Sequence, residues 1–525
     1  MKAFALVLLL LPAVARAEDP AIPAFADETL SSGLEHSFTG EWTFMVGGGA
    51  AAFDCNGDRK PELFMAGGTA MAQLFRNDSA IGGALKFVAV ESGLEQDEVA
   101  GGYPIDIDSD GITDLVLLRV GPDRVMRGLG DCRFEEATDW GFDGLDLWST
   151  AFAATWERGA DWPTLAVGTY IDRTQEAFPW GSCTPNYLYR PKGKGFDSPL
   201  PLTPGFCALS ILFTDWNRSG TPALRVSNDR EYYKGGQEQM WRIDPDAAPV
   251  LYGEKDGWAR LRIWGMGIAS TDLNLDGYPD YYLTSMADNK LQTLAAPPID
   301  GKVVPKFSDV AFAKGAIAQR PYTGDDLRPS TAWHADFQDV NNDGRADLWV
   351  AKGNVWEMPD FAQKDPNNLM LQRADGTFFE AGDKAGVASF RQARGGALAD
   401  FNLDGLIDIA AVNRNEPAEI WRNTGGETGH WVQFLPMQPA PNQHGTGGWI
   451  EVKRDDGQVL RREMTIGGGH AGGSLGWWHF GLGAVDRTEV RVIWPDGTEG
   501  PWQAVAADGF YTLERGKEPQ AWVPE

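Results

Sequence analysis

The sequence predicts an all-β protein in which a seven-bladed β-propeller is followed by a small β-sandwich-like C-terminal domain. Three observations lead to this prediction. An Asp-rich motif recurs along most of the chain, short apolar segments typical of strands follow its copies, and the pattern changes near residue 430. The composition agrees, because 63 Gly and 32 Pro among 525 residues indicate many turns and 43% hydrophobic residues indicate a folded core.

The first 17 residues have the features of a secretory signal peptide. Lys2 supplies a positive charge, residues 3–11 form an apolar run, and Ala15-Arg16-Ala17 matches an A-x-A cleavage site. The apolar run is too short to span a bilayer, and no later segment approaches the ~20 apolar residues of a membrane helix. We therefore expect an exported protein, periplasmic or extracellular, without a membrane span.

The charge of the chain argues against one class of partner. Its 74 acidic and 46 basic residues give a formal net charge of -28, and no cluster of Lys and Arg interrupts the acidic excess. Such a surface repels a phosphate polymer. We therefore expect no nucleic-acid partner.

The repeated motif begins with Asp, has Asp or Asn at position 3, Asp at position 5, Gly at position 6 in most copies and an acid at position 9. The five full copies read DCNGDRKPEL, DIDSDGITDL, DLNLDGYPDY, DVNNDGRADL and DFNLDGLIDI, and they start at Asp54, Asp106, Asp272, Asp339 and Asp400. Two degenerate copies fill the gaps. One covers residues 155–167, and the other starts at Asp215 and has Ser219 and Ala223 at positions 5 and 9.

The seven units start near residues 54, 106, 156, 215, 272, 339 and 400, at intervals of about 50 to 67 residues. Units of this length with several short strands are typical of propeller blades, so residues 18–427 are predicted to form seven blades. Gly also recurs five residues before the first Asp, at Gly49, Gly101, Gly267 and Gly395. Because Gly otherwise weakens a strand, its recurrence predicts close backbone approach around a shared axis.

The oxygen-rich loops predict calcium binding. Side chains at positions 1, 3 and 5 can converge on one ion, Gly at position 6 allows a sharp reversal, and the acid at position 9 completes the ligand set. Oxygen-only ligands favour Ca²⁺ over Mg²⁺. An EF-hand would need Glu at position 12, where four of the full copies instead have Leu117, Leu283, Val350 and Ala411, so each loop is expected to join two strands.

The alternative is that Asp, Asn and Gly serve only as turn formers. Five copies with the same ligand spacing favour metal binding, with up to five Ca²⁺, and the copy at Asp215 is expected to be empty. The predicted ligands are Asp54, Asn56, Asp58 and Glu62; Asp106, Asp108, Asp110 and Asp114; Asp272, Asn274, Asp276 and Asp280; Asp339, Asn341, Asp343 and Asp347; and Asp400, Asn402, Asp404 and Asp408.

This motif resembles the FG-GAP or VCBS repeat of the integrin α-chain propeller and of many secreted bacterial proteins. The resemblance covers about residues 40–425 and implies an integrin-like propeller that depends on calcium. It departs from the family pattern in the third and fourth units, and in the first unit Arg59 replaces Gly and Glu62 replaces the closing Asp.

Beyond residue 430 the pattern predicts a separate β domain, residues 428–515, followed by a C-terminal tail, residues 516–525. Alternating residues 449–453 and 459–464 flank a turn and indicate a hairpin. The Gly-rich residues 467–473 are expected to form a flexible loop rather than an anion site. The motifs GTGGWIEV (445–452), HFGLG (479–483) and VRVIWPDG (490–497) resemble the ASPIC/UnbV domain, which follows FG-GAP propellers in the cartilage acidic protein 1-like family.

The chain has four Cys, which an exported protein would keep oxidised. Three pairings are possible. We favour Cys55 with Cys132 and Cys183 with Cys207, because each pair would join neighbouring repeats. A metal site is a weaker alternative, since no two Cys form a C-x-x-C pair.

No catalytic motif is found. The six His have no metal-binding spacing, and neither a G-x-S-x-G elbow nor a P-loop is present. The 21 Trp suit sugar stacking, but packing between blades is favoured. We therefore predict an exported calcium-binding scaffold for a protein or glycan, with no catalytic residues. The alternative is an exported enzyme, a polysaccharide-active hydrolase or an oxidoreductase, that uses the propeller funnel.

Overall fold

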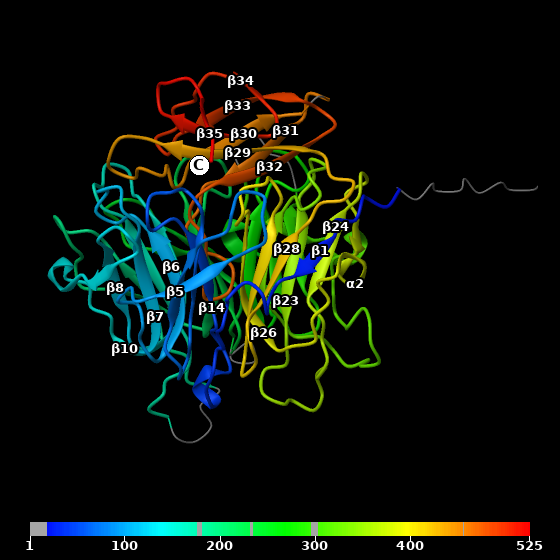
Figure 1. The fold of residues 1–525 in the computed structure, drawn as a ribbon. Helices are drawn as coiled ribbons and strands as arrows, with labels where there is room; N and C mark the ends of the chain where they lie inside the picture. Colours follow the sequence, from blue (N-terminus) through cyan, green and yellow to red (C-terminus); the bar gives the residue numbers. More distant parts are fainter. Residues whose placement is uncertain (1–17, 176–180, 231–234, 296–302, 455, 525) are drawn as a thin grey trace, which may run out of the picture.

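The computed structural model describes residues 18–175, 181–230, 235–295, 303–454 and 456–524, so the predicted signal peptide lies outside the described residues. Seven four-stranded antiparallel units surround a common axis, and a second β domain stacks on one end of the ring (Figure 1). The prediction of an all-β, seven-bladed propeller with a sandwich-like C-terminal domain is confirmed. No helix among the described residues is long and apolar enough to cross a membrane.

The blades are numbered in chain order, and each is given from its innermost strand outward. Blade 1 contains β2 (Ala50–Phe53), β3 (Glu62–Met65), β4 (Gln73–Asn77) and β5 (Phe87–Val90); blade 2 contains β6 (Val99–Ile105), β7 (Asp114–Pro122), β8 (Arg124–Gly128) and β9 (Phe134–Glu136). Blade 3 contains β10 (Asp146–Thr155), β11 (Thr164–Thr169), β12 (Asn186–Tyr189) and β13 (Leu200–Leu202); blade 4 contains β14 (Ala208–Thr214), β15 (Ala223–Asn228), β16 (Gln239–Arg242) and β17 (Val250–Leu251).

Blade 5 contains β18 (Gly265–Thr271), β19 (Asp280–Ser285), β20 (Lys290–Leu294) and β21 (Phe307–Asp309); blade 6 contains β22 (Ala332–Gln338), β23 (Asp347–Lys352), β24 (Asn368–Gln372) and β25 (Phe378–Glu380). Blade 7 contains β26 (Ala393–Ala399), β27 (Asp408–Asn413), β28 (Glu419–Asn423) and β1 (Phe25–Asp27). Among the described residues, the short helices are α1 (Ala311–Lys314), α2 (Gly382–Ala385), η1 (Trp42–Phe44), η2 (Thr138–Trp140) and η5 (Glu254–Asp256).

Small residues in the innermost strands let neighbouring blades pack closely. Strand β2 is the fully buried sequence AAAF, and β26 is ARGGALA. A Cβ added to Gly396 of β26 would lie 2.3 Å from the ring of Trp349, which comes from blade 6. The core therefore consists of apolar layers between blades, built from large side chains on one blade and small residues on the next.

The ring closes through a strand that the repeat pattern did not predict. Strand β1, near the N-terminus, forms the outer strand of blade 7 by antiparallel pairing with β28, with Phe25 opposite Asn423. The hydrogen bond from the Ala24 amide to the Gly425 carbonyl, at 2.8 Å, extends this pairing. The first and last segments of the propeller are thus held in one sheet.

The C-terminal domain is a sandwich of two four-stranded sheets with an apolar core that includes Phe434, Ile450 and Phe480. The first sheet has the strand order β32 (Trp478–Gly483), β29 (His430–Met437), β35 (Gly509–Glu514) and β36 (Gln520–Trp522). The second sheet has the strand order β31 (Val459–Glu463), β30 (Trp449–Lys453), β33 (Arg487–Ile493) and β34 (Gln503–Ala506). The expectation of a tail at residues 516–525 is wrong in part, because β36 pairs with β35 and extends the sheet.

Both favoured disulfides are present. Cys55 in the first loop of blade 1 is bonded to Cys132 in the turn between β8 and β9, and Cys183 of blade 3 is bonded to Cys207 just before β14. Each bond therefore joins consecutive blades, as the positions of the Cys in the repeats suggested.

Candidate functional site

The Asp-rich loops lie between the first and second strands of their blades, at the end of the propeller that carries the C-terminal domain (Figure 1). The first loop, for example, follows β2 and ends at Glu62, the first residue of β3. The prediction that each loop joins two strands is therefore correct.

The five full loops share one backbone conformation. Positions 4 and 6 both have positive φ angles, as at Leu275 (60°) and Gly277 (93°) in blade 5 and at Leu403 (54°) and Gly405 (84°) in blade 7. Arg59, which replaces the expected Gly in the first loop, also has a positive φ of 65°. Such angles are unfavourable for residues other than Gly and persist where the surrounding structure fixes them, often at functional sites.

A common set of hydrogen bonds fixes this conformation. The carboxylate at position 1 accepts the amide at position 6, at distances of 2.7 to 3.1 Å in the five loops. The acid at position 9 accepts the amide at position 2, at 2.8 to 3.1 Å. Position 5 accepts the amide at position 7, at 2.8 to 3.0 Å. The acids are thus gathered on the inside of each turn.

Burial makes these acids costly to ionise. Desolvation raises the pKa of Asp106 to about 7 and that of Asp400 to about 8, and neighbouring carboxylates add to both shifts. The same two causes raise the pKa of Asp114 and of Asp408 well above its usual range. A bound cation would remove the repulsion between the carboxylates and favour their ionised forms.

The donor set fits a hard cation. In blade 2, carboxylate oxygens of Asp106, Asp108 and Asp114 lie within 4.8 Å of one another. One buried oxygen of Asp106 and one of Asp272 have no hydrogen-bond partner, and the same is true of the amide oxygen of Asn402. Oxygen atoms left in this state are suited to coordinate a metal ion such as Ca²⁺.

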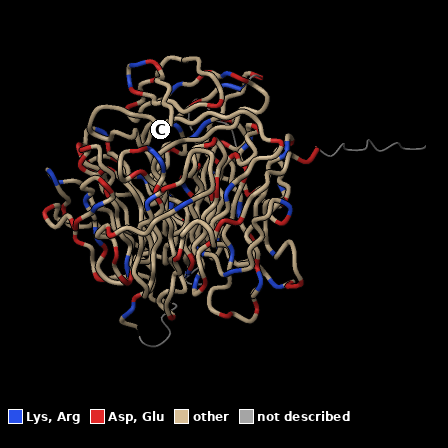
Figure 2. Tube along the Cα trace, in the orientation of Figure 1, with Lys and Arg blue, Asp and Glu red and all other residues tan. Residues whose placement is uncertain are grey.

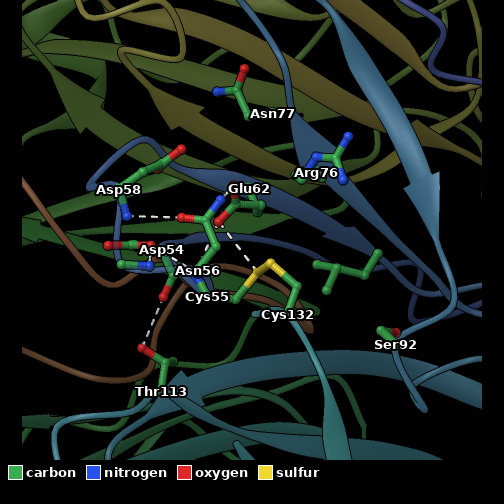
Figure 3. The surroundings of a disulfide bond; sticks show 12 residues. Asp54, Cys55, Asn56, Asp58, Glu62, Arg76, Asn77, Ser92, Thr113 and Cys132 are labelled. Atoms are coloured by element: carbon green, nitrogen blue, oxygen red, sulfur yellow. Dashed lines mark hydrogen bonds between the residues drawn. A yellow bond between two sulfur atoms is a disulfide. The ribbon is translucent and has the colours of Figure 1, made fainter. Parts of the chain in front are cut away.

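The first loop is tied to blade 2 by a disulfide (Figure 3). Cys55 occupies position 2, and Thr113 of the next loop donates a 3.1 Å hydrogen bond to the Asp54 carbonyl. Cys55, Glu62 and Cys132 are close together, but the two sulfur atoms are bonded to each other and are not metal ligands. Oxygen atoms alone therefore make up the candidate site of blade 1.

The degenerate loop at Asp215 keeps the turn but lacks the acids. Asp215 accepts the amides of Ser219 and Gly220 at 2.8 and 3.0 Å, as in the full loops. Arg218, at position 4, forms a 3.0 Å ion pair with Glu451 of the C-terminal domain. Because Ser219 and Ala223 replace the acids at positions 5 and 9, this loop is a poor cation site.

The C-terminal domain covers the ends of the loops and contacts six of the seven blades through them. The contacts are Trp477 to the Arg59 carbonyl (2.9 Å), Gln443 to the Ser109 carbonyl (2.6 Å), Arg218 to Glu451 (3.0 Å), Arg461 to Asp272 (3.0 Å), Arg454 to the Gly344 carbonyl (2.8 Å) and Gln433 to Asp400 (2.7 Å). Loop conformation and domain docking are therefore coupled.

The expectation of a flexible loop at residues 467–473 is wrong, because this segment runs through the propeller axis. Backbone hydrogen bonds link it and its flanking residues to five blades. These bonds are Leu475 to Ala52 (3.0 Å), Gly102 to Ala471 (3.1 Å), Ala154 to Ile466 (3.1 Å), Gly468 to Ile211 (2.7 Å) and Gly469 to Ile268 (2.7 Å).

His470, at the centre of this axial loop (residues 466–475), is fully buried. Its amide donates to the imidazole of His334 in blade 6, at 3.1 Å, and its own imidazole accepts the Gly47 amide at 3.2 Å. Desolvation lowers the pKa of His470 to about 3, so the imidazole is neutral. At Gly472 a larger residue would collide with an innermost strand, because an added Cβ would lie 2.1 Å from the Ala50 carbonyl oxygen.

Comparison with known proteins agrees with both halves of the fold. The FG-GAP-like repeat family model matches residues 54–117 and 339–411, and the ASPIC and UnbV model matches residues 438–520. The chain thus contains FG-GAP-like repeats in its propeller and an ASPIC/UnbV domain after it.

The chain is similar to cartilage acidic protein 1. It is 47% identical to the Homo sapiens protein over 60 residues, which cover 11% of this chain and 9% of that one. It is 23% identical to the Mus musculus protein over 237 residues, which cover 44% and 34% of the two chains. These matches therefore span at most about a third of the relatives' length.

A crystal structure of BBS1N in complex with ARL6DN aligns with a TM-score of 0.44 and 10% identity, over 77% of this chain and 98% of that one.

Proposed function

We propose that the protein is an exported, calcium-binding propeller scaffold that binds a protein or a glycan. The observation that carries the calcium part is the recurrence, in five loops, of one hydrogen-bonded turn that gathers buried carboxylates. Export is supported by the signal-like residues 1–17 and by two disulfides, which persist in oxidising compartments.

Calcium would act as a structural ion. In each full loop it would be held by the side chains at positions 1, 3, 5 and 9, where it would offset the charge of acids that are costly to bury. The C-terminal domain rests directly on two of these acids, through Arg461 on Asp272 and Gln433 on Asp400. Calcium would therefore stabilise the docking of the domain as well as the blades.

The opposite end of the propeller is the proposed binding face, because the C-terminal domain covers the loop end. Leu327, Trp356 and Phe390, in loops at that end, are 76%, 39% and 42% exposed. The Arg414 guanidinium lies over the Trp356 ring, 4.5 Å from its centre. Exposed aromatic residues backed by Arg are typical of binding hot spots.

Figure 2 shows Lys and Arg interspersed with Asp and Glu over the visible side of the propeller, without a continuous basic stretch. This distribution supports a protein or uncharged glycan partner rather than a polyanion.

An enzyme that acts on a polysaccharide through the funnel is less well supported. The axial loop crosses the funnel and is hydrogen-bonded to five blades, so a polymer has no path along the axis. An enzyme acting there would need a small substrate.

The experiment that tests the proposal combines calcium removal with binding. Melting temperature is measured with Ca²⁺ and with excess chelator, because an ion at ~100 times its dissociation constant adds about 2.7 kcal/mol per site. Binding to a glycan array and to an array of extracellular protein domains is then compared for the wild type, a Trp356→Ala/Phe390→Ala variant and a Phe312→Ala control, whose Phe is 82% exposed in α1. Loss of binding in Trp356→Ala/Phe390→Ala but not in Phe312→Ala supports the proposed binding face. Unchanged binding in Trp356→Ala/Phe390→Ala contradicts the proposal.

A further inference from the structure

A cavity of about 480 Å³ lies between the axial loop and the C-terminal domain. It is lined by innermost strands, by the loops of blades 1 and 2, by the axial loop, by β29 and by residues from the end of β31 to the start of β32. Its lining reaches the exposed residues Gly57, Gly111 and Ser474, so the cavity extends toward solvent beside the loops of blades 1 and 2. This axial chamber falls within the size range of small-molecule sites.

At one position of its innermost strand, blade 6 contributes a charged residue to the chamber where the other blades have uncharged residues. Asp336 lies three residues before the first Asp of its loop, in the innermost strand β22. The residues at this position in the other six blades are Ala51, Tyr103, Ala153, Leu212, Ala269 and Ala397. The propeller fold therefore has no general need for a carboxylate there.

The C-terminal domain contributes Arg462 and Glu463 to the same chamber, and Glu463 already accepts hydrogen bonds from the Thr214 hydroxyl and the Asp215 amide. Arg462 lies on β31, and it also lines a neighbouring cavity under the loops of blades 5 and 6. Among the described residues its guanidinium has no hydrogen bond or ion pair, and it lies over the Trp478 ring, 5.6 Å from the ring centre. A part-buried guanidinium without a partner is unfavourable for stability alone.

The two charges influence each other without forming an ion pair. Desolvation raises the pKa of Asp336 to about 6 and lowers that of Arg462, and each charge partly opposes the shift of the other. Asp336 has one weak side-chain contact, from the Gln338 amide at 3.5 Å. An acid and a base thus border one chamber with a gap between them.

Other polar groups around the chamber also lack partners. They are the Ser270 hydroxyl, the Gln338 amide oxygen and the His479 Nδ1. Buried polar atoms in native proteins are nearly always hydrogen-bonded to protein, to water or to a ligand. Several such groups at one cavity indicate that it is built to hold a polar molecule.

We propose that the axial chamber binds a small zwitterion of the α-amino acid class. The Arg462 guanidinium would take the carboxylate in a two-point contact, and Asp336 would take the ammonium group. Gln338 and Ser270 would supply further hydrogen bonds, while apolar lining residues such as Leu398 and Leu435 would contact the side chain. None of these polar residues is a predicted calcium ligand, although Asp54, Asn56 and Asp400 of the calcium loops also line the chamber. The chamber lies at the end of the propeller opposite the proposed partner-binding face.

The test uses the full-length protein in saturating Ca²⁺ and a panel of the common L-amino acids, screened by thermal shift and measured by calorimetry. For each binder, the matched des-amino carboxylate and decarboxylated amine are titrated as well. We expect the zwitterion to bind at least tenfold more tightly than either analogue, and Asp336→Asn and Arg462→Met each to weaken it at least tenfold. The control substitutions are Asp486→Asn and Arg487→Gln, which lie at exposed positions of the C-terminal domain.

Three outcomes would overturn the proposal: no binding by any amino acid, equal binding of the des-amino carboxylate, or binding that survives both substitutions. A further measurement separates a ligand role from a structural one. Because Arg462 has no partner, Arg462→Met without ligand should melt at or above the wild-type temperature. A fall of several degrees would mean that the guanidinium is structural and that the chamber holds only water.

Discussion

Substituting Gly101 by Ala should displace the axial loop. Gly101 lies on β6, and a Cβ at this position would lie 1.9 Å from the Ala471 carbonyl oxygen and 2.9 Å from the Ala471 side chain. The backbone angles of Gly101 are not in the positive-φ region, so the effect of the substitution is steric. The loop must then move by about an ångström or leave the axis.

The expected cost follows from these two responses. A local shift in a well-packed core costs about 1–3 kcal/mol. Complete displacement of the axial loop would break its backbone hydrogen bonds, which include those to Gly102, Ile211 and Ile268. Each lost hydrogen bond would lower the free energy of unfolding by about 1 kcal/mol. We therefore expect Gly101→Ala to lower the free energy of unfolding by about 3 kcal/mol.

Denaturant unfolding measures this cost, and limited proteolysis followed by mass spectrometry reports cleavage within residues 466–475. Gly253→Ala is the matched control, because its added Cβ meets no atom closer than 3.9 Å. We expect faster cleavage of the axial loop in Gly101→Ala only. Equal unfolding midpoints and equal cleavage rates in the two variants would show that the loop does not occupy the axis.

Three further predictions concern acids and disulfides. Burial raises the pKa of Asp123 to about 8, so the free energy of unfolding of the wild type should fall as the pH rises from about 4 to about 8. Asp123→Asn lacks this titration, so its free energy of unfolding relative to the wild type should increase by up to ~1.4 kcal/mol per pH unit, as measured by urea unfolding. Asp110→Ala should remove one Ca²⁺ from the stoichiometry measured by calorimetry, whereas Asp161→Ala, in the degenerate third unit, should remove none. Replacing Cys183 and Cys207 by Ala should cost about 3 kcal/mol, because their bond closes a separation of 24 residues.

Each of these predictions has a contradicting result. A stability difference for Asp123→Asn that is constant between pH 5 and pH 8 would mean that the carboxyl is ionised throughout. Equal calcium stoichiometry in Asp110→Ala and the wild type would remove blade 2 from the set of sites. An unchanged unfolding midpoint without the Cys183–Cys207 bond would show that other contacts already hold blades 3 and 4 together.

The local parts of the fold could be predicted from the sequence. The motif at Asp106 or Asp339 contains its own turn former, its closing acid and the strand that follows, so a single copy specifies the loop and its two strands. The spacing of these copies predicted seven blades. The positions of Cys55 and Cys132 in consecutive units favoured their pairing over the two alternatives.

Features that depend on distant segments were missed. Strand β1 has three residues, and its partner β28 lies about 400 residues away in the chain, so no local pattern indicates the pairing. The Gly residues before each loop did predict close approach. At Gly49 and Gly101, however, the close neighbour is the axial loop and not another blade.

The axial chamber could have been suspected from the repeats themselves. His334 and Asp336 interrupt a pattern of small or apolar residues that the other blades keep. Arg462 gave no such signal, because an Arg in a hairpin strand is ordinarily solvent-exposed. Only the docking of the C-terminal domain brings Arg462 and Asp336 to one cavity.

The central claim, that the five full loops bind calcium and thereby hold the propeller and its C-terminal domain together, is tested most directly by calcium stoichiometry. The full-length protein is dialysed against Ca²⁺, its bound metal is measured by mass spectrometry, and its melting temperature is recorded before and after chelation. The account predicts saturable binding that approaches five Ca²⁺ per chain and a marked fall in melting temperature on chelation. A metal-free protein with an unchanged melting temperature would contradict it.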